Sequence, residues 1–592
     1  MMARGTDNCR SRTVLHKAPP RAPHREHQED GVGVSSEVIR SRKGRTLVVI
    51  GDPTLLTMDR LAEFTSRIDS DPRIASLSLV AVPSTDGRWL RAAGPAGPLT
   101  AIATDLSDLV GDVDESSPDD VDAWVQRASE RGLWHDWWMT SDADVARADG
   151  ARTPAAVDIV EADDPGSSRH HALRAYMPKE GRLTVTVDVT WLGPHETGSQ
   201  VLTTAAIADL AQQQQVTAIR LVGLDELPAY AQHLTDHDKV QLVATEEAKR
   251  SDIVWYPNQI DGRGTIGQAR KLGARVVTTY LDLIAYDIPR YHASPEAWHA
   301  YRALQRRVAL SVDGITTISA DVASRLLEEV PRLDPERVQP ITLGLDHITS
   351  ESAPENPDDD LADLVKSLKG KRFVVVLGND FQHKNRDFAI KVWERALQSG
   401  EPCDLVLAGL HVKSSSSKDA EDDLKARHLD LRGRIHTVGH VTSASRAWLL
   451  ANATVALYPS SAEGFGFVPY EAAALGTPTV FTDFGPLKEV AAAPGLPASW
   501  SVEAHAADLS QLLANAKARH ARVEAFNQAI ERQTWDSFAR QLTEFFRHIT
   551  RMPEVPTSSL AGESGADAAA LAAVMSSKSY RAAEKLRRVL RR

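Results

Sequence analysis

The sequence predicts an α/β fold in which two doubly wound parallel sheets face a shared cleft, with an extra α/β segment before them. Short apolar runs that end at Gly or Pro alternate with helix-length segments, a pattern typical of parallel sheets covered by helices. This alternation starts at residue 182 and again at residue 372, and an acidic run separates the two series. Two such units joined by a hinge place a ligand cleft at the carboxyl ends of both sheets.

Each strand of this prediction is a short run rich in Val, Ile and Leu. In the N-terminal part we expect strands at 46–51 and 74–82, with a helix over 58–68 between them. The first parallel series then has strands at 182–193, 218–223, 252–257 and 274–282. The second series has strands at 372–378, 403–409, 434–439, 454–459 and 479–482. Such continuous apolar runs are expected of strands that are buried on both faces.

The same pattern divides the chain into segments. Residues 1–45 show no hydrophobic period, and we expect a disordered arm there. We then expect an N-terminal α/β unit whose role the sequence does not indicate (46–180), a first doubly wound domain (181–354), a linker (355–365), a second doubly wound domain with a closing helix (366–550) and a tail (551–592).

Composition narrows the function classes. The chain has 592 residues, which corresponds to roughly four domains of ordinary size. Its net charge of −12 argues against nucleic acid as the main partner. Two cysteines cannot build a disulfide framework, and no apolar run is long enough for a membrane-spanning helix. We therefore expect a cytoplasmic protein.

Residues 454–490 predict an anion-binding site. A strand ends at Pro459, a glycine-bearing loop follows, and a short helix begins near Pro469. Free N–H groups of such a loop and helix start favour a negatively charged ligand. Glu463 and Glu471 flank the same place, and carboxylates beside an anion suit the hydroxyls of a sugar and a ribose. A plain strand–helix turn with solvated glutamates is the alternative interpretation.

This stretch resembles the retaining GT-B glycosyltransferases of the family-4 type (glycosyl transferases group 1). The match consists of two glutamates separated by seven residues, followed by the Gly, Pro and Glu positions of the family's signature: Glu463, Glu471, Gly476, Pro478, Gly485 and Glu489. The resemblance implies that Glu463 and the loop backbone hold the donor sugar and that Glu471 binds the ribose of the nucleotide. The loop residues are Gly464, Phe465, Gly466 and Phe467.

The resemblance extends to the start of the second domain. In "FVVVLGNDFQHKN", Gly378 and Lys384 are in register with the family's glycine and lysine. Lys384 would then neutralise the donor diphosphate, since a cation stabilises a leaving group's charge. The family's arginine is Asn379 in this chain, so one charge of the diphosphate site is absent.

On the acceptor side the resemblance is looser. Gly198 lies in a loop similar to the one that approaches the diphosphate, and Asp282 stands beside the family's histidine position, which is Leu281 here. Ser319 and Gly344 match positions that line the cleft.

The resemblance implies a retaining, metal-independent transfer of a sugar from a nucleotide-diphosphate-sugar to an acceptor hydroxyl. The donor is a co-substrate, and no cofactor is expected. The acceptor would be a glycan or a lipid-linked molecule, as in glycan, polysaccharide or glycolipid synthesis. Two alternatives stay open: a catalytically impaired scaffold subunit, for which Asn379 and Leu281 argue, and a nucleotide-sugar epimerase.

The tail ends in a basic segment. Residues 578–592 place Lys578, Arg581, Lys585, Arg588 and Arg592 largely along one side of a helix. A basic amphipathic helix is typical of contact with an anionic membrane surface. This predicts peripheral attachment at the inner face of a membrane; a solvated, charged terminus is the alternative.

Overall fold

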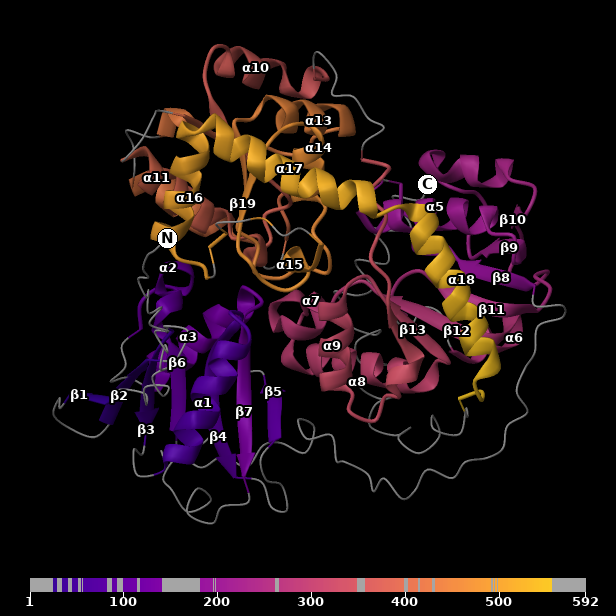
Figure 1. The fold of residues 1–592 in the computed structure, drawn as a ribbon, viewed down its shortest axis with the longest axis horizontal. Coiled ribbons are helices and arrows are strands. Elements are labelled where there is room, and N and C mark those ends of the chain that lie inside the picture. Colours follow the sequence, from indigo (N-terminus) through magenta and orange to yellow (C-terminus); the bar gives the residue numbers. More distant parts are fainter. Residues whose placement is uncertain are drawn as a thin grey trace, which may run out of the picture.

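The computed structural model shows three α/β bodies (Figure 1). It describes residues 25–555, apart from 29–34, 41–44, 52–54, 56, 82–87, 93–98, 114–117, 141–181, 195, 197, 261–265, 349–356, 399–402, 414–415, 428–431, 491–492, 494–495 and 498. The predicted basic segment, residues 578–592, therefore lies outside the described residues, and only residues 551–555 of the predicted tail are described. No described helix is long and apolar enough to cross a membrane.

The first body is a seven-stranded sheet in the order β1-β2-β3-β6-β4-β7-β5. Only β4 and β7 run parallel, and the other neighbours are antiparallel. The strands are β1 (Arg25–Gln28), β2 (Ser35–Arg40), β3 (Thr46–Gly51), β4 (Ile74–Ala81), β5 (Arg88–Ala92), β6 (Leu99–Ala103) and β7 (Trp134–Thr140). The helices are α1 (Met58–Ser70), α2 (Ser107–Val110) and α3 (Pro118–Glu130).

Two of these strands correct the sequence analysis. The expected disordered arm over 1–45 is wrong for β1 and β2, which pair with each other and, through β2, with β3. In β2, Glu37 and Arg40 are interspersed with Val38 and Ile39, so the segment has no continuous apolar run. Pairing with β1 on one side and β3 on the other gives this partly polar segment its strand conformation.

The second body is a parallel sheet in the order β10-β9-β8-β11-β12-β13-β14. Its strands are β8 (Leu183–Asp188), β9 (Val216–Val222), β10 (Val240–Leu242), β11 (Ser251–Tyr256), β12 (Gly273–Tyr280), β13 (Gly314–Thr317) and β14 (Val338–Pro340). The covering helices are α5 (Gly198–Gln212), η5 (Ala229–Asp236), α6 (Ile266–Leu272), α7 (Ile284–Asp287), η6 (Pro289–Tyr291), α8 (Pro295–Ser311), α9 (Ala320–Glu329) and η7 (Pro335–Arg337). Every residue of β12 is buried, as expected for a central parallel strand.

The third body is a parallel sheet in the order β17-β16-β15-β18-β19. Its strands are β15 (Phe373–Leu377), β16 (Asp404–Ala408), β17 (Ile435–Val438), β18 (Val455–Tyr458) and β19 (Thr479–Phe481). Its helices are η8 (Asp359–Leu361), α10 (Ala362–Leu368), η9 (Gln382–Lys384), α11 (Arg386–Leu397), α12 (Lys418–Arg427), η10 (Arg432–Arg434), α13 (Ser443–Asn452), α14 (Val468–Ala474), α15 (Leu487–Val490), α16 (Val502–Ala514) and α17 (Ala516–Arg532).

The linker expected over 355–365 is shorter than predicted. The structure places η8 and the start of α10 inside that range, and Leu361 and Leu364 are buried in the core of the third body. The sequence analysis did not predict this helix, because the segment is rich in aspartate and its apolar positions are few and widely spaced.

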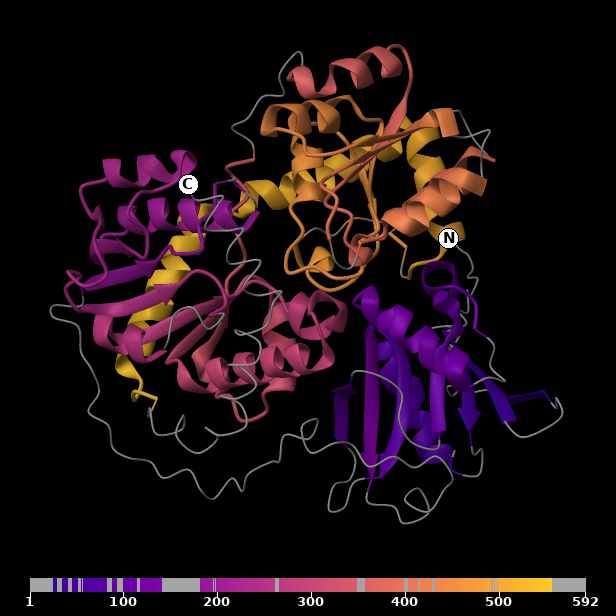
Figure 2. The same ribbon diagram turned by 180° about the vertical axis from the view of Figure 1, so that it is seen from behind.

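The last helix, α18 (Trp535–Arg551), returns from the third body to the second (Figures 1 and 2). Phe546 packs edge-on against Trp255 of β11, with ring centroids 6.0 Å apart. A Cβ on Gly314 of β13 would lie 2.8 Å from Ile549, so the helix sits directly on this sheet. The helix thereby ties the two parallel-sheet bodies together. The predicted closing helix has this role.

Candidate active site

Lys384 and Glu463 meet at the point where the strand order of the third sheet reverses. Lys384 follows β15, Glu463 follows β18, and these two strands are neighbours that start the two halves of the sheet. Ligands of open α/β sheets bind beyond the carboxyl ends of strands at such a point. The Lys384 Nζ lies 2.5 Å from Glu463 Oε1, to which the Tyr458 hydroxyl also donates a hydrogen bond at 2.5 Å.

The cluster is largely removed from solvent. The Glu463 side chain is 8% exposed and that of Lys384 is 21% exposed. Burial, together with the Glu463 charge, raises the pKa of Tyr458 well above its ordinary value, so the phenol remains a hydrogen-bond donor to the carboxylate. A charge in such a water-poor place acts more strongly on a ligand than it would in bulk water.

Asn385 fixes the two loops relative to each other. It is the only non-glycine residue with positive φ among the described residues (φ 51°), and its side chain is buried. Its amide donates to the Pro459 carbonyl at 2.9 Å and to Ser461 Oγ at 3.0 Å. Because Asn385 follows Lys384 directly, these bonds join the lysine loop to the glutamate loop.

The glycine loop presses against the second body. A Cβ on Gly464 would lie 1.9 Å from the Leu281 carbonyl oxygen and 3.0 Å from Asp282 Cβ. Gly466 has φ 87°, a conformation that favours glycine. The Phe465 ring stacks on Tyr470 with ring centroids 5.5 Å apart, and its centroid lies 5.2 Å from that of Phe467. The Phe467 ring in turn lies 3.3 Å from the position that a Cβ on Gly198 would take. The predicted donor loop and Gly198 therefore meet across the two bodies.

Helix α14 begins and ends where the sequence predicts. Pro469 stands in its first turn, where a missing N–H costs no hydrogen bond. Gly476 follows the helix with φ 82°, which a glycine adopts without strain. Glu471 lies in the first turn and forms an ion pair with Arg446 of α13. Any ribose bound by Glu471 would share the carboxylate with this arginine.

Neither His383 nor Arg386 replaces the arginine that the family has at the position of Asn379. Asn379 is exposed, and its side chain accepts a hydrogen bond from the Leu410 amide at 3.0 Å. The Arg386 guanidinium is 2% exposed and is paired with Glu421 at 3.0 Å. His383 is buried, bonded to the Tyr291 hydroxyl at 2.5 Å, and burial together with the Lys384 charge holds its pKa well below the ordinary value. Gly378, with φ 138°, has the Lys384 side chain 3.8 Å from where a Cβ would be.

Asp282 lies on the opposite side of the glycine loop. Its carboxylate accepts a hydrogen bond from the Ile284 amide at 2.8 Å, and its carbonyl accepts one from Gln259 Nε2 at 2.7 Å. Burial raises the pKa of the Asp282 carboxyl, and the negative charge of Glu463 adds to this shift. Two carboxylates of different bodies thus influence each other across the contact.

This shift predicts the stability of Asp282→Asn. A raised folded-state pKa means that the ionised carboxylate destabilises the fold above the ordinary value of 3.8, and that this cost vanishes as the pH falls below it. We expect the variant, which keeps an acceptor for Ile284, to melt at a higher temperature than wild type at pH 7.5. The difference should shrink as the pH is lowered to 4. Thermal unfolding across this pH range measures it.

Asp363→Asn is the matched control, because that side chain is 99% exposed. Its melting temperature should follow wild type at every pH. A lower melting temperature of Asp282→Asn at pH 7.5 would contradict the assigned burial cost.

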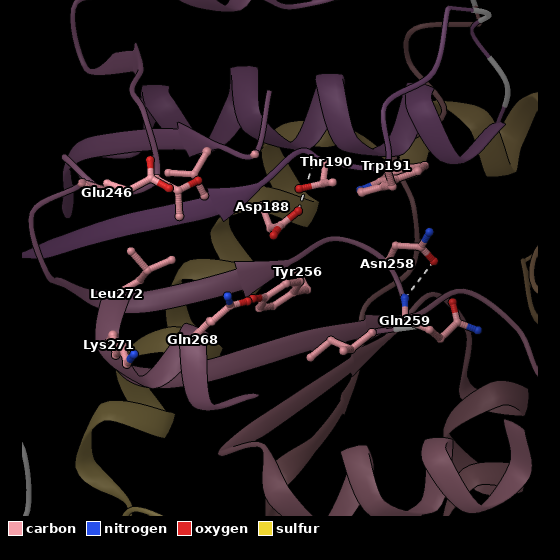
Figure 3. A pocket seen from close by; sticks show the side chains of 15 residues that line it. Asp188, Thr190, Trp191, Glu246, Tyr256, Asn258, Gln259, Gln268, Lys271 and Leu272 are labelled. Carbon is pink, nitrogen blue, oxygen red and sulfur yellow. Dashed lines mark hydrogen bonds between the residues drawn. The ribbon is translucent and has the colours of Figure 1, made fainter. Parts of the chain in front are cut away.

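A cavity of about 560 Å³ opens next to Asp282 in the second body (Figure 3). It begins at the carboxyl ends of β8 and β11, again where the strand order reverses, and Gln259 connects it to Asp282. Aromatic and polar side chains line it: Asp188, Thr190, Trp191, Glu246, Tyr256, Asn258, Gln259, Gln268 and Lys271. Rings beside hydrogen-bonding groups suit a hydroxyl-rich ligand.

Two predicted cleft residues have packing roles in the structure. A Cβ on Gly344 would lie 2.4 Å from the Trp535 amide nitrogen, so the glycine lets the chain pass close to the start of α18. The Ser319 hydroxyl caps α9 by accepting from the Val322 amide at 3.3 Å. Among the described residues no group of three or more His, Cys, Asp or Glu side chains could hold a metal ion, and the metal-independent reaction stays a prediction.

Sequence reasoning missed several residues of this region: Tyr458, Arg446, Gln259, Tyr291 and the residues lining the cavity. Tyr458 could have been found, because it is a polar-tipped residue at the end of a buried strand that leads into the glycine loop. Arg446 and Tyr291 lie in segments without any local motif, so only the fold shows that they belong here.

The two parallel-sheet bodies with their covering helices form a two-domain α/β arrangement of the GT-B type. Residues 361–528 match the family model described as glycosyl transferases group 1. The match covers the third body, and together with the curated relatives it shows that the chain is a glycosyltransferase.

Curated relatives agree with this assignment. The chain is 26% identical over 310 residues to an MMP alpha-(1->4)-mannosyltransferase of Mycolicibacterium hassiacum, which covers 50% of this chain and 70% of that enzyme. It is 40% identical over 106 residues to a D-inositol 3-phosphate glycosyltransferase of Corynebacterium urealyticum, of which it spans only 25%. A crystal structure of HepE from Anabaena in complex with UDP and glucose superposes with a TM-score of 0.44 at 17% identity, over 61% of this chain and 99% of that one.

Proposed function

We propose that this glycosyltransferase moves a sugar from a nucleotide-diphosphate-sugar to an acceptor hydroxyl with retention of the anomeric configuration. The observation that carries the proposal is the Lys384–Glu463–Tyr458 cluster, which stands at the ligand-binding point of the third sheet and faces Asp282. A cation and a carboxylate in contact match the two halves of such a donor, a charged diphosphate and a hydroxylated sugar.

Each residue has a distinct part in this scheme. The Lys384 ammonium stabilises the charge that develops on the departing diphosphate, as preorganised cations do. Glu463 accepts hydrogen bonds from sugar hydroxyls, and Tyr458 keeps the carboxylate oriented. Glu471 binds the ribose. The bond between the anomeric carbon and the diphosphate breaks, the acceptor oxygen attacks the same face, and its proton passes to the leaving diphosphate.

The acceptor would enter from the second body. The cavity lined by Trp191 and Tyr256 offers rings and hydrogen-bonding groups to a glycan or the headgroup of a lipid-linked acceptor. Gln259 links this cavity to Asp282, which would orient the attacking hydroxyl. In this scheme the donor and the acceptor would bind on either side of the contact between Gly464 and Leu281.

A donor screen tests the proposal. The purified chain is incubated with UDP-, GDP- and ADP-sugars and with mono- and disaccharide acceptors, and release of nucleoside diphosphate is measured together with the product's anomeric configuration by NMR. Acceptor-dependent release with a retained anomer is expected for one donor. Inversion would overturn the retaining assignment. Tight donor binding without turnover for any acceptor would favour the scaffold alternative, which Asn379 motivates.

The variant Lys384→Ala distinguishes loss of the ammonium charge from a disturbed fold of the site. The ammonium addresses only phosphate, so we expect binding of the nucleoside diphosphate to weaken about tenfold or more, while binding of the nucleoside alone is almost unchanged. Titration calorimetry with both ligands measures the difference. An equal loss for both ligands would indicate a disturbed site rather than a missing phosphate contact. Lys366→Ala, at an exposed helix position, is the control.

A further inference from the structure

The first body touches the loops that carry Lys384 and Glu463. The contact is made by a tight turn, Arg131–Gly132, between α3 and β7. Gly132 has φ 78°, and a Cβ on it would lie 2.7 Å from the Cβ of Ala462, the residue that precedes Glu463 in the chain. The Arg131 carbonyl accepts a hydrogen bond from the Ser461 hydroxyl. The turn therefore packs against the glutamate loop without a gap.

The Arg131 side chain binds the lysine loop. Its two terminal nitrogens donate to the two Asp387 carboxylate oxygens at 3.0 and 2.6 Å, the fork geometry that arginine favours with a carboxylate. One of them also donates to Asn385 Oδ1 at 2.7 Å. Asp387 is 4% exposed. Burial alone would raise the pKa of this carboxyl, yet the Arg131 charge holds it below the ordinary value.

These bonds converge on the residue that joins the two loops. Asn385 uses its amide nitrogen to hold Pro459 and Ser461, and its amide oxygen receives the hydrogen bond from Arg131. Its left-handed backbone is unfavourable for a residue other than glycine and is maintained by surrounding contacts. Without Arg131, the Asn385 oxygen and the Asp387 carboxylate lose this cationic donor at a buried place.

The same body is anchored to the acceptor-side domain by another arginine. Arg73, 2% exposed, pairs with Asp71 at 2.7 Å and donates from both terminal nitrogens to Asp321 of α9. Its guanidinium lies 3.9 Å from the centre of the Trp134 ring, which begins β7. Arg73 and the Arg131–Gly132 turn thus attach the first body to both halves of the GT-B fold. The ribbon of the first body lies next to both of them in Figures 1 and 2.

We infer that the N-terminal body is a positioning element of the active site: its Arg131–Gly132 turn holds the loops of Lys384 and Glu463 in their reactive arrangement. This inference rests on the proposed function, and it gives a role to a segment that lies outside the two parallel-sheet domains. Arg131 is a positioning residue, because it acts through Asn385, Asp387 and Ser461. Displacing such groups by about 1 Å lowers rates by up to a hundredfold.

The experiment compares three variants of the full chain. Arg131→Ala and Asp387→Asn remove the ion pair from either side. Arg127→Ala is the matched control, since Arg127 lies in the last turn of α3, just before the Arg131–Gly132 turn, but bonds to the Val110 and Asp112 carbonyls of its own body. We expect the first two to lower kcat about tenfold with little change in donor KM, whereas the control keeps the wild-type kcat. Arg131→Lys, which retains charge but not the fork, should recover part of the rate.

Amide hydrogen exchange supplies a readout that needs no turnover. Exchange over residues 459–467 should be faster in Arg131→Ala and Asp387→Asn than in wild type or Arg127→Ala. Unchanged exchange there, or a kcat of Arg131→Ala equal to that of the control, overturns the inference. If Arg131→Ala does not fold, Arg131→Lys and Asp387→Asn decide the question. Failure of wild type to use any donor would refute the proposed function while the exchange result still tests the positioning.

Discussion

Glu463→Gln is expected to lower kcat by about a hundredfold or more, the scale on which loss of one preorganised electrostatic group slows an enzyme. The substitution keeps the shape of the side chain and an oxygen that accepts from Tyr458, so the fold should be preserved. It removes the charge that pairs with Lys384 at 2.5 Å. Steady-state turnover with the donor found in the screen measures the effect, and thermal unfolding checks the fold.

The control for this variant is Glu503→Gln, whose side chain is 68% exposed and pairs with Arg395 away from the cluster. It should turn over at the wild-type rate. A wild-type kcat for Glu463→Gln would remove the carboxylate from the mechanism. A loss of kcat accompanied by an equal loss of nucleoside diphosphate binding would place Glu463 in donor binding alone.

The fold class was predictable because of how parallel sheets bury their strands. β12 and β15 are buried along their whole length, and both contain uninterrupted runs of β-branched residues, VVTT in β12 and VVV in β15, that need no context to be recognised. A glycine directly after such a run, such as Gly378 after β15, marked the end of the strand. The first body lacks this signature, since its sheet is largely antiparallel and its edge strands, β1 and β5, are short and rich in charged residues.

The site was predictable only as far as it is local in sequence. The glycine loop, Glu463 and Glu471 fall within nine residues, so one motif indicates them all. Lys384 and Glu463 are 79 positions apart, and both were assigned to the site through a resemblance, which did not predict their direct contact. The Arg131–Asp387 pair spans 256 positions. No periodicity or composition connects such residues, because the contact depends on how whole bodies pack.

The contact between Gly464 and Leu281 makes the glycine itself testable. We expect Gly464→Ala to reduce kcat/KM by about a hundredfold, because its Cβ would stand 1.9 Å from the Leu281 carbonyl oxygen, a clash with backbone that only a shift of the loop relieves. The loop must then move away from Asp282, which separates the donor side from the acceptor side. Kinetics with both substrates varied measures this loss.

The clash in Gly464→Ala lies between two bodies rather than inside one core, so each body should still fold. Gly439→Ala is the matched control, since a Cβ at Gly439 meets nothing within 4 Å. It should keep wild-type kinetics. Because the third body alone carries Lys384 and Glu471, nucleoside diphosphate should still bind to Gly464→Ala with an affinity close to that of wild type. Wild-type kcat/KM in this variant would show that the close approach of Gly464 to Leu281 is not required for transfer, and that the two sides of the cleft react at a greater separation.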